Sequence, residues 1–162
     1  MTSQVLHHTD SARLSRWVIV GFLSGAAAVL VFHQGAAALL HALDLIARAP
    51  YSLQPTRPWG VPQLWSITLW GGVWGAVLAA TLARLDGARL LLAALVFGAI
   101  FPTLVAWFIV APLKGQPMAG GFAAATMMVG PILNGAWGLG TGMGLALFGR
   151  AGAPPTRSAP SP

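Results

Sequence analysis

Four polar side chains near residues 33–44 interrupt an otherwise apolar sequence and are the group in this chain most able to do chemistry. They are His33, Gln34, His41 and Asp44. At about 100° per residue of helix, His33 and Asp44 lie about 20° apart around the axis, as do Gln34 and His41. All four fit one polar stripe, of which His41 and Asp44 form the secondary part nearer the helix end. Ionisable side chains in a membrane helix normally face a bundle or a water-filled cavity, so the stripe predicts a binding face.

Imidazoles are common metal and haem ligands, so the two histidines were considered for that chemistry. At 1.5 Å per residue, His33 and His41 lie about 12 Å apart along one helix and cannot hold one ion together. The sequence therefore predicts neither a metal site nor a cofactor. Axial ligation of a tetrapyrrole by His33 across an oligomer interface is one alternative. A neutral histidine bonded to a backbone carbonyl, with His41 and Asp44 at the headgroup level, is another.

Two further polar side chains are expected at the depth of His33. Counted from the ends of the apolar runs at 1.5 Å per residue, Thr103 and Asn134 fall in the same outer half of a bilayer. The sequence therefore predicts an outward-facing polar pocket formed by His33, Gln34, Thr103 and Asn134. Ordinary packing is the competing interpretation, since threonine and proline are common in membrane helices.

The residues that could do chemistry belong to four long apolar segments. Hydrophobic residues make up 56% of the chain and charged residues 7%, whereas a soluble domain carries roughly a quarter charged residues. The predicted fold is an all-α integral membrane protein, a four-helix transmembrane bundle. Its predicted spans are residues 17–43, 63–83, 88–111 and 122–148.

Prolines shape both the loops and the helices of this bundle. Residues 44–61 contain three prolines and are predicted to form an interfacial loop. Pro102 and Pro131 lie inside the third and fourth spans. Because each removes one backbone hydrogen bond and clashes with the preceding turn, both helices are predicted to kink there.

The basic residues indicate orientation rather than nucleic-acid binding, because they lie singly or in pairs at the ends of the apolar runs. One side of the four-span layout carries most of them: Arg13, Arg16, Arg84, Arg89, Arg150 and Arg157. The other side carries Arg48, Arg57 and Lys114. Both termini are therefore predicted to be cytoplasmic. Residues 1–16 are expected to form an N-terminal tail, residues 17–148 one transmembrane domain, and residues 149–162 a disordered tail.

Small residues at helical spacing predict close helix contacts. Gly138 and Gly142 form such a motif in the fourth span, and Gly71 and Gly75 offer a matching groove in the second. Motifs of this kind serve contacts within one chain or between copies. A homo-oligomer or a larger membrane complex is therefore the expected partner, beside the lipid bilayer itself.

Several enzyme classes are excluded by composition. The chain has no cysteine and no glutamate, and its aspartates are Asp10, Asp44 and Asp86. These rule out thiol chemistry and leave no carboxylate in the middle of a span for proton transport. Glycine clusters lie inside the apolar runs, so no phosphate-binding loop is predicted. The expected function is that of a non-enzymatic accessory, scaffold or self-associating membrane protein. The alternatives are an oligomeric small-molecule or ion permease and a histidine-ligated cofactor or redox subunit.

Three stretches of the chain carry a resemblance. VFHQGAAALLHAL, FPTLVAWFIVAPLKGQPMAGG and GPILNGAWGLGTGMG together resemble small hypothetical inner-membrane proteins of Gram-negative bacteria with four transmembrane helices. The likeness covers roughly residues 17 to 148. It implies a bacterial cytoplasmic-membrane location and brings no activity with it.

Overall fold

The computed structural model describes residues 2–57 and 59–149, which are mostly helical, with four long helices along the four apolar runs. The first run holds α1 (Thr2–Ala28), the π-helical segment η1 (Val29–His33) and α2 (Gln34–Ala42). The second run is α3 (Gln63–Leu82). The third holds α4 (Gly87–Val105), the π-helical segment η2 (Ala106–Val110) and α5 (Ala111–Leu113). The fourth holds α6 (Ala124–Gly144) and the π-helical segment η4 (Leu145–Gly149).

Three helical stretches of the described chain are long and apolar enough to cross a membrane. They are Leu14–Ala42, Gln63–Leu82 and Gly87–Leu113. The long helix α6 is not among them, because glycines and Asn134 separate its apolar residues and lower its mean hydropathy. The helix α1 also begins at Thr2, well before the apolar run. All but Gly149 of the predicted disordered tail lies outside the described residues.

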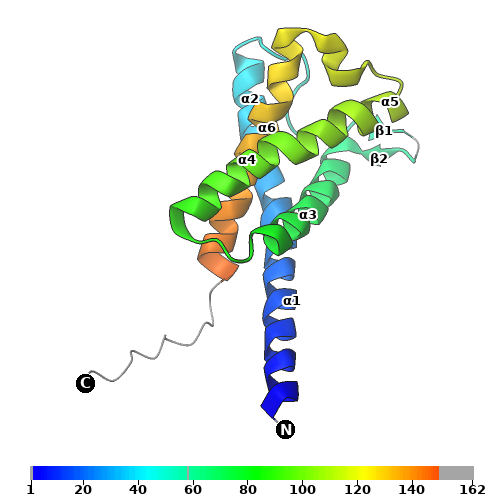
Figure 1. Cartoon of the computed structure of the whole chain (residues 1–162). Coiled ribbons are helices and arrows are strands. Elements are labelled where there is room, and N and C mark those ends of the chain that lie inside the picture. The colour runs from blue at the N-terminus through cyan, green and yellow to red at the C-terminus, as the bar shows by residue number, and fades with distance from the viewer. Residues whose placement is uncertain (1, 58, 150–162) are drawn as a thin grey trace.

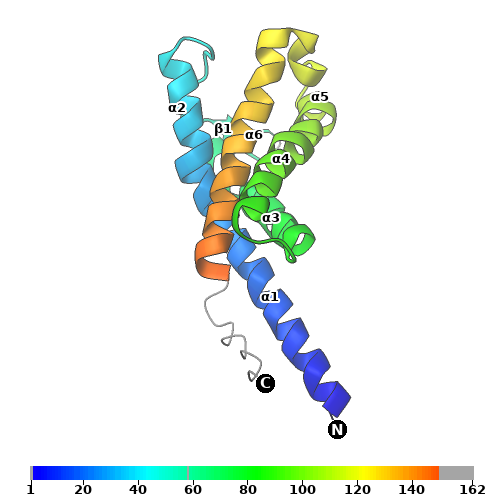
Figure 2. The same cartoon turned by 60° about the vertical axis from the view of Figure 1, so that its left-hand side comes forward.

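The four long helices form two pairs that are joined through α6. The helix α1 packs against α3, and α4 packs against α6. The contact between α1 and α6 joins the pairs, so α6 lies between the first run and α4 (Figures 1 and 2). The helices α3 and α4 contact each other only sparsely. This spatial order leaves room between α3 and α4 toward the end of the bundle where α5 lies.

The α1–α3 pair is held at backbone distance by four glycines. A Cβ atom on Gly21 would lie 2.6 Å from the carbonyl oxygen of Gly75. One on Gly25 would press on the carbonyl oxygen of Gly71 and lie 2.9 Å from the Cα of Gly75. The groove formed by Gly71 and Gly75 is therefore filled by the α1 backbone, and the Trp137 side chain of α6 also reaches Gly71.

The α4–α6 pair uses the same kind of contact. A Cβ atom on Gly98 would press on the carbonyl oxygen of Asn134 and lie 2.9 Å from the Cα of Gly138. One on Gly138 would press on the carbonyl oxygen of Ala94, and one on Gly142 would lie 2.8 Å from the Ala94 side chain. Each helix pair thus presents small residues four apart on both partners.

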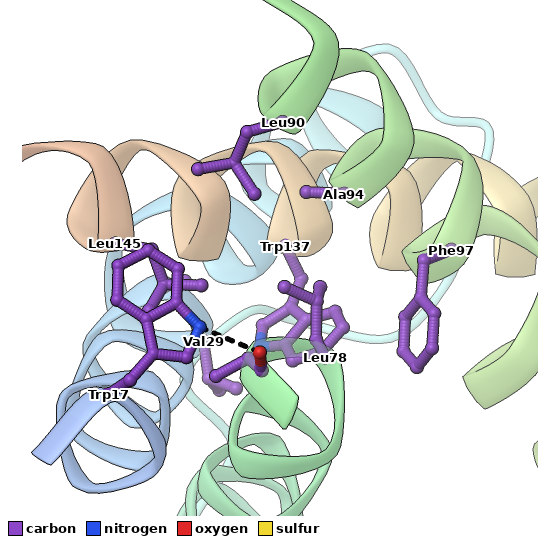
Figure 3. Close-up of a cluster of buried hydrophobic side chains, with 10 residues drawn as sticks. Trp17, Val29, Leu78, Leu90, Ala94, Phe97, Trp137 and Leu145 are labelled. Carbon is purple, nitrogen blue, oxygen red and sulfur yellow. Dashed lines mark hydrogen bonds between the residues drawn. The ribbon is translucent and has the colours of Figure 1, made fainter. Parts of the chain in front are cut away.

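Two tryptophans bond to neighbouring helices within one core, and one of them joins the two pairs (Figure 3). The indole N–H of Trp17 donates to the carbonyl oxygen of Ala79 at 2.7 Å, which joins α1 to α3. The indole N–H of Trp137 donates to the carbonyl oxygen of Gly25 at 2.9 Å, which joins α6 to α1. Leu78, Leu90 and Leu145 are fully buried beside them. The core around these two tryptophans is therefore apolar and closely packed.

Three short segments depart from regular α-helix, and the kinks expected at Pro102 and Pro131 stay predictions. The helical assignment runs through both Pro102 in α4 and Pro131 in α6. Of the three π-helical segments in the described chain, η2 begins four residues after Pro102, and η1 and η4 contain no proline. A π-helical turn contains one residue more than an α-helical turn and leaves carbonyl groups without their usual donors.

The connection between α2 and α3 is a folded loop, residues 43–62, hereafter the 43–62 loop. It contains a two-residue strand β1 (Pro55–Thr56) that pairs antiparallel with β2 (Val61–Pro62). Its turn is closed by the Gly60 N–H, which donates to the Thr56 carbonyl oxygen at 2.8 Å. The α5–α6 connection at the same end contains the 3₁₀ segment η3 (Met118–Phe122), in which Ala119, Gly120 and Gly121 have positive φ.

Candidate functional site

A cavity of about 1110 Å³ opens at the end of the bundle where α3 and α4 diverge, beside the 43–62 loop; it is called the loop cavity below. Its walls come from η1 and α2, from the loop, from the first turns of α3, and from η2 and α5. The polar side chains that line it are His33, Gln34, Arg48, Ser52, Gln54, Thr56, Arg57, Gln63, Ser66, Lys114 and Gln116. Its apolar floor includes Ala37, Ile67, Val110 and Leu133.

The charge on the cavity wall is all of one sign. Arg48, Arg57 and Lys114 line it, and in the described part of the chain no acidic side chain does. All three cationic side chains are exposed, and no hydrogen bond or ion pair holds them to another described residue. The lining of the loop cavity therefore carries positive charge, on donors that have no partner among the described residues.

Gln34 fixes the loop against the inner wall of the cavity. Its side chain is only 5% exposed. Its Oε1 accepts the backbone N–H of Tyr51 at 2.6 Å. Since a backbone N–H requires an acceptor, this bond also fixes which end of the amide is oxygen. The Nε2 group of Gln34 is left as a donor in the cavity wall.

Tyr51 makes a second anchor through the π-helical segment. Its hydroxyl donates to the carbonyl oxygen of Leu30 at 2.9 Å. In a regular α-helix that carbonyl would accept the N–H of Gln34, but here this N–H donates to Val29 and Val31. The irregular turn thus frees an acceptor for Tyr51. The φ of 54° at Tyr51 is unusual for a residue other than glycine, and the two hydrogen bonds hold it there.

His33 lies on the same wall, half-buried beside Gln34. The contact from Gln34 Nε2 to His33 Nδ1 is 3.5 Å. With Nδ1 facing a donor, the neutral ring carries its proton on Nε2. In the described chain every buried side-chain nitrogen has a hydrogen-bond partner. The Nε2 of His33 has none, so it is not buried, and His33 lines the cavity.

The four residues of the expected polar pocket fall into two separate places. His33 and Gln34 line the loop cavity, and Thr103 and Asn134 do not. Asn134 Nδ2 donates to Thr103 Oγ1 at 2.9 Å, which ties α6 to α4. Thr103 is 1% exposed, so this pair is a contact between helices and forms no wall of the cavity.

The expected stripe on the first helix stops before Asp44. The helix α2 ends at Ala42, and Asp44 follows with φ 57° and an exposed side chain. The backbone N–H of Asp44 donates to the His41 carbonyl oxygen at 3.0 Å in a tight turn. The His41 Nδ1 is 3.0 Å from the Ile46 carbonyl oxygen. The prediction required a continuous helix to residue 44, and the turn at Leu43 removes Asp44 from that face.

Metal and cofactor ligands were sought among the described residues. No group of three His, Cys, Asp or Glu side chains there could hold a metal ion. His33 and His41 each face a different neighbour, as described above.

Sequence reasoning missed four residues of this site. The sequence places Arg48, Arg57 and Lys114 only on one side of the four-span layout, and it gives Tyr51 no role in a site. A usable signal was present, because all three bases lie on the predicted outer side, where a topology rule expects few. Their convergence on one cavity required the folded loop.

Comparison of the chain with known protein families, proteins and structures finds no similar protein. No protein-family model matches the chain, and no curated protein or solved structure matches it.

Proposed function

We propose that this chain is a non-enzymatic, four-span protein of the bacterial cytoplasmic membrane that binds a small molecule in the loop cavity, which opens away from the cytoplasm. Both termini are cytoplasmic in this proposal. The cavity itself is the observation that carries it. About 1110 Å³ is ample for a small ligand, and the walls combine an apolar floor with polar groups, as ligand sites do.

Binding is favoured over passage through a single copy. Beyond the loop cavity the helices meet through glycine backbones, and Trp137 and Leu78 fill the space between them. The cavity is therefore a vestibule that ends at a dry core. Such a vestibule fits an accessory role. In this role the chain binds the small molecule and either passes it to a partner protein or signals its presence to that partner.

Orientation and access are tested together by cysteine labelling, for which the chain is naturally suited because it has no cysteine. Ser66→Cys places a thiol in the cavity wall, and Ala83→Cys places one on an exposed position just after α3, toward the other end of the bundle. We expect a membrane-impermeant maleimide to label Ser66→Cys in intact spheroplasts and Ala83→Cys only after lysis. The reverse pattern, or a Ser66→Cys that never reacts, would overturn the proposal.

A further inference from the structure

We propose that the loop cavity selects an anionic amphiphile, a phosphate or carboxylate group carried on an apolar body. The inference rests on the proposed function and names the ligand class of the same site. The juxtaposition that carries it is three unpaired cationic side chains over an apolar floor.

The cations come from separate parts of the chain. Arg48 and Arg57 both belong to the 43–62 loop, before and directly after strand β1. Lys114 follows α5. No described acidic side chain lines the cavity to neutralise them. A guanidinium donates two parallel hydrogen bonds to a carboxylate or phosphate, and an ammonium adds a compact charge. An anionic oxygen group is therefore the ligand class that these side chains attract.

The inner wall adds neutral donors. Gln34 Nε2 faces His33 Nδ1 with one N–H and keeps a second, and His33, which also lines the cavity, carries its own proton on Nε2. Both donors are carried by the helical run rather than by the loop. The wall therefore supplies hydrogen bonds to a ligand oxygen that enters below the three cations.

The floor accounts for the apolar part of the ligand. Ala37 and Ile67 contribute aliphatic surface from α2 and α3, and Val110 and Leu133 contribute it from η2 and α6. An inorganic phosphate ion would leave this surface wet. Because α3 and α4 contact each other only sparsely, a short chain attached to the anion has room between them.

The test uses octyl phosphate as the probe, titrated into the full-length protein in dodecyl maltoside and followed by isothermal calorimetry. The cavity variant replaces Arg48, Arg57 and Lys114 with glutamine. The matched control replaces Arg16, Arg84 and Arg89, which are exposed and do not line the cavity. Both variants lose the same charge. We expect the cavity variant to weaken octyl phosphate binding about a hundredfold and the control less than threefold, since two or more charge-assisted bonds are lost.

A second variant keeps the charge and removes the space. Ala106→Phe projects a ring from η2 into the cavity, and we expect it to weaken octyl phosphate at least tenfold. Equal binding by wild type and the cavity variant, or an equal loss in the control, overturns the proposal. Octyl glucoside binding as tightly as octyl phosphate overturns it too. Such results leave the labelling pattern of Ser66→Cys intact, so the failure of the ligand class is distinguishable from that of the site.

The source of the anion is resolved by two more probes. Phosphatidylglycerol in nanodiscs and inorganic phosphate in solution are compared with octyl phosphate as competitors. Competition by the lipid supports a headgroup as the ligand, and competition only by soluble amphiphiles supports a free metabolite of that class. Inorganic phosphate competing as well as octyl phosphate contradicts the role of the apolar floor.

Discussion

The two halves of this bundle are packed differently, although the same helices run through both. In the half that contains Trp17 and Trp137, glycines let backbones touch and indoles bond across helices. In the other half α3 and α4 separate, and a loop carrying Arg48 and Arg57 folds beside the gap. Close backbone contacts at one end of the bundle thus accompany a cavity at the other.

The largest effect is expected from filling the α1–α3 glycine contact. In Gly25→Ala the new methyl group meets the backbone of Gly71 and Gly75, which cannot move aside as a side chain could. Such overpacking should destabilise the fold by about 3 kcal/mol. Thermal unfolding in detergent measures it. Gly35→Ala is the matched control, because nothing lies within 4 Å of its Cβ position, and it should be neutral or slightly stabilising. Equal unfolding temperatures for the two variants would contradict the contact.

A smaller loss is expected from Trp137→Phe in the same half. The substitution removes the hydrogen bond to the Gly25 carbonyl oxygen and leaves part of the indole volume empty. Together these should cost roughly 2 kcal/mol. Phe32→Leu, a change of a half-buried aromatic packed beside the core, is the comparison. If Trp137→Phe is no more destabilising than Phe32→Leu, the indole bond does not tie the two helix pairs.

In the cavity half, Tyr51→Phe should cost less stability and change accessibility more. It removes the hydroxyl that bonds the Leu30 carbonyl oxygen but keeps the backbone bond to Gln34. The free energy of unfolding should fall by about 1 kcal/mol. Proteolysis within the 43–62 loop should become faster in detergent. Trp59→Phe, at an 87% exposed aromatic in the same loop, is the control and should change neither.

The smallest effect concerns the polar bond between α4 and α6. A double-mutant cycle of Thr103→Val and Asn134→Leu should give a coupling energy of about 0.6 kcal/mol, the typical value for a polar contact between membrane helices. The cycle is read from unfolding curves in one detergent. A coupling near zero would mean that the two side chains do not hold the second helix pair together, and neither change should alter octyl phosphate binding.

Much of the helical layout follows from the sequence, because it depends on local signals. Apolar runs bounded by prolines and by Asp86-Gly87 place the second, third and fourth long helices within a few residues, whereas α1 begins at Thr2, well before its predicted start. The site was only partly accessible to such reasoning. The depth of a residue in the membrane, counted along its helix, groups His33 with Gln34, and both line the cavity. Depth does not say which side of a helix faces the cavity. It therefore also groups Thr103 and Asn134 with them, although these two residues lie elsewhere. Gly21 and Gly25 went unnoticed because their partners, Gly71 and Gly75, could be paired only in three dimensions.

The π-helical segment at Val29–His33 amounts to one surplus residue in an otherwise α-helical run. One residue of helix is a rotation of about 100°, so everything after the segment faces a direction set by that surplus. If this segment became a regular α-helix with every residue kept, Gln34 and Ala37 would turn away from the cavity, while the contact of Gly21 and Gly25 with α3 would stay in place. The wide turn at η1 therefore sets the direction in which α2 faces, separately from the close contact that α1 makes with α3.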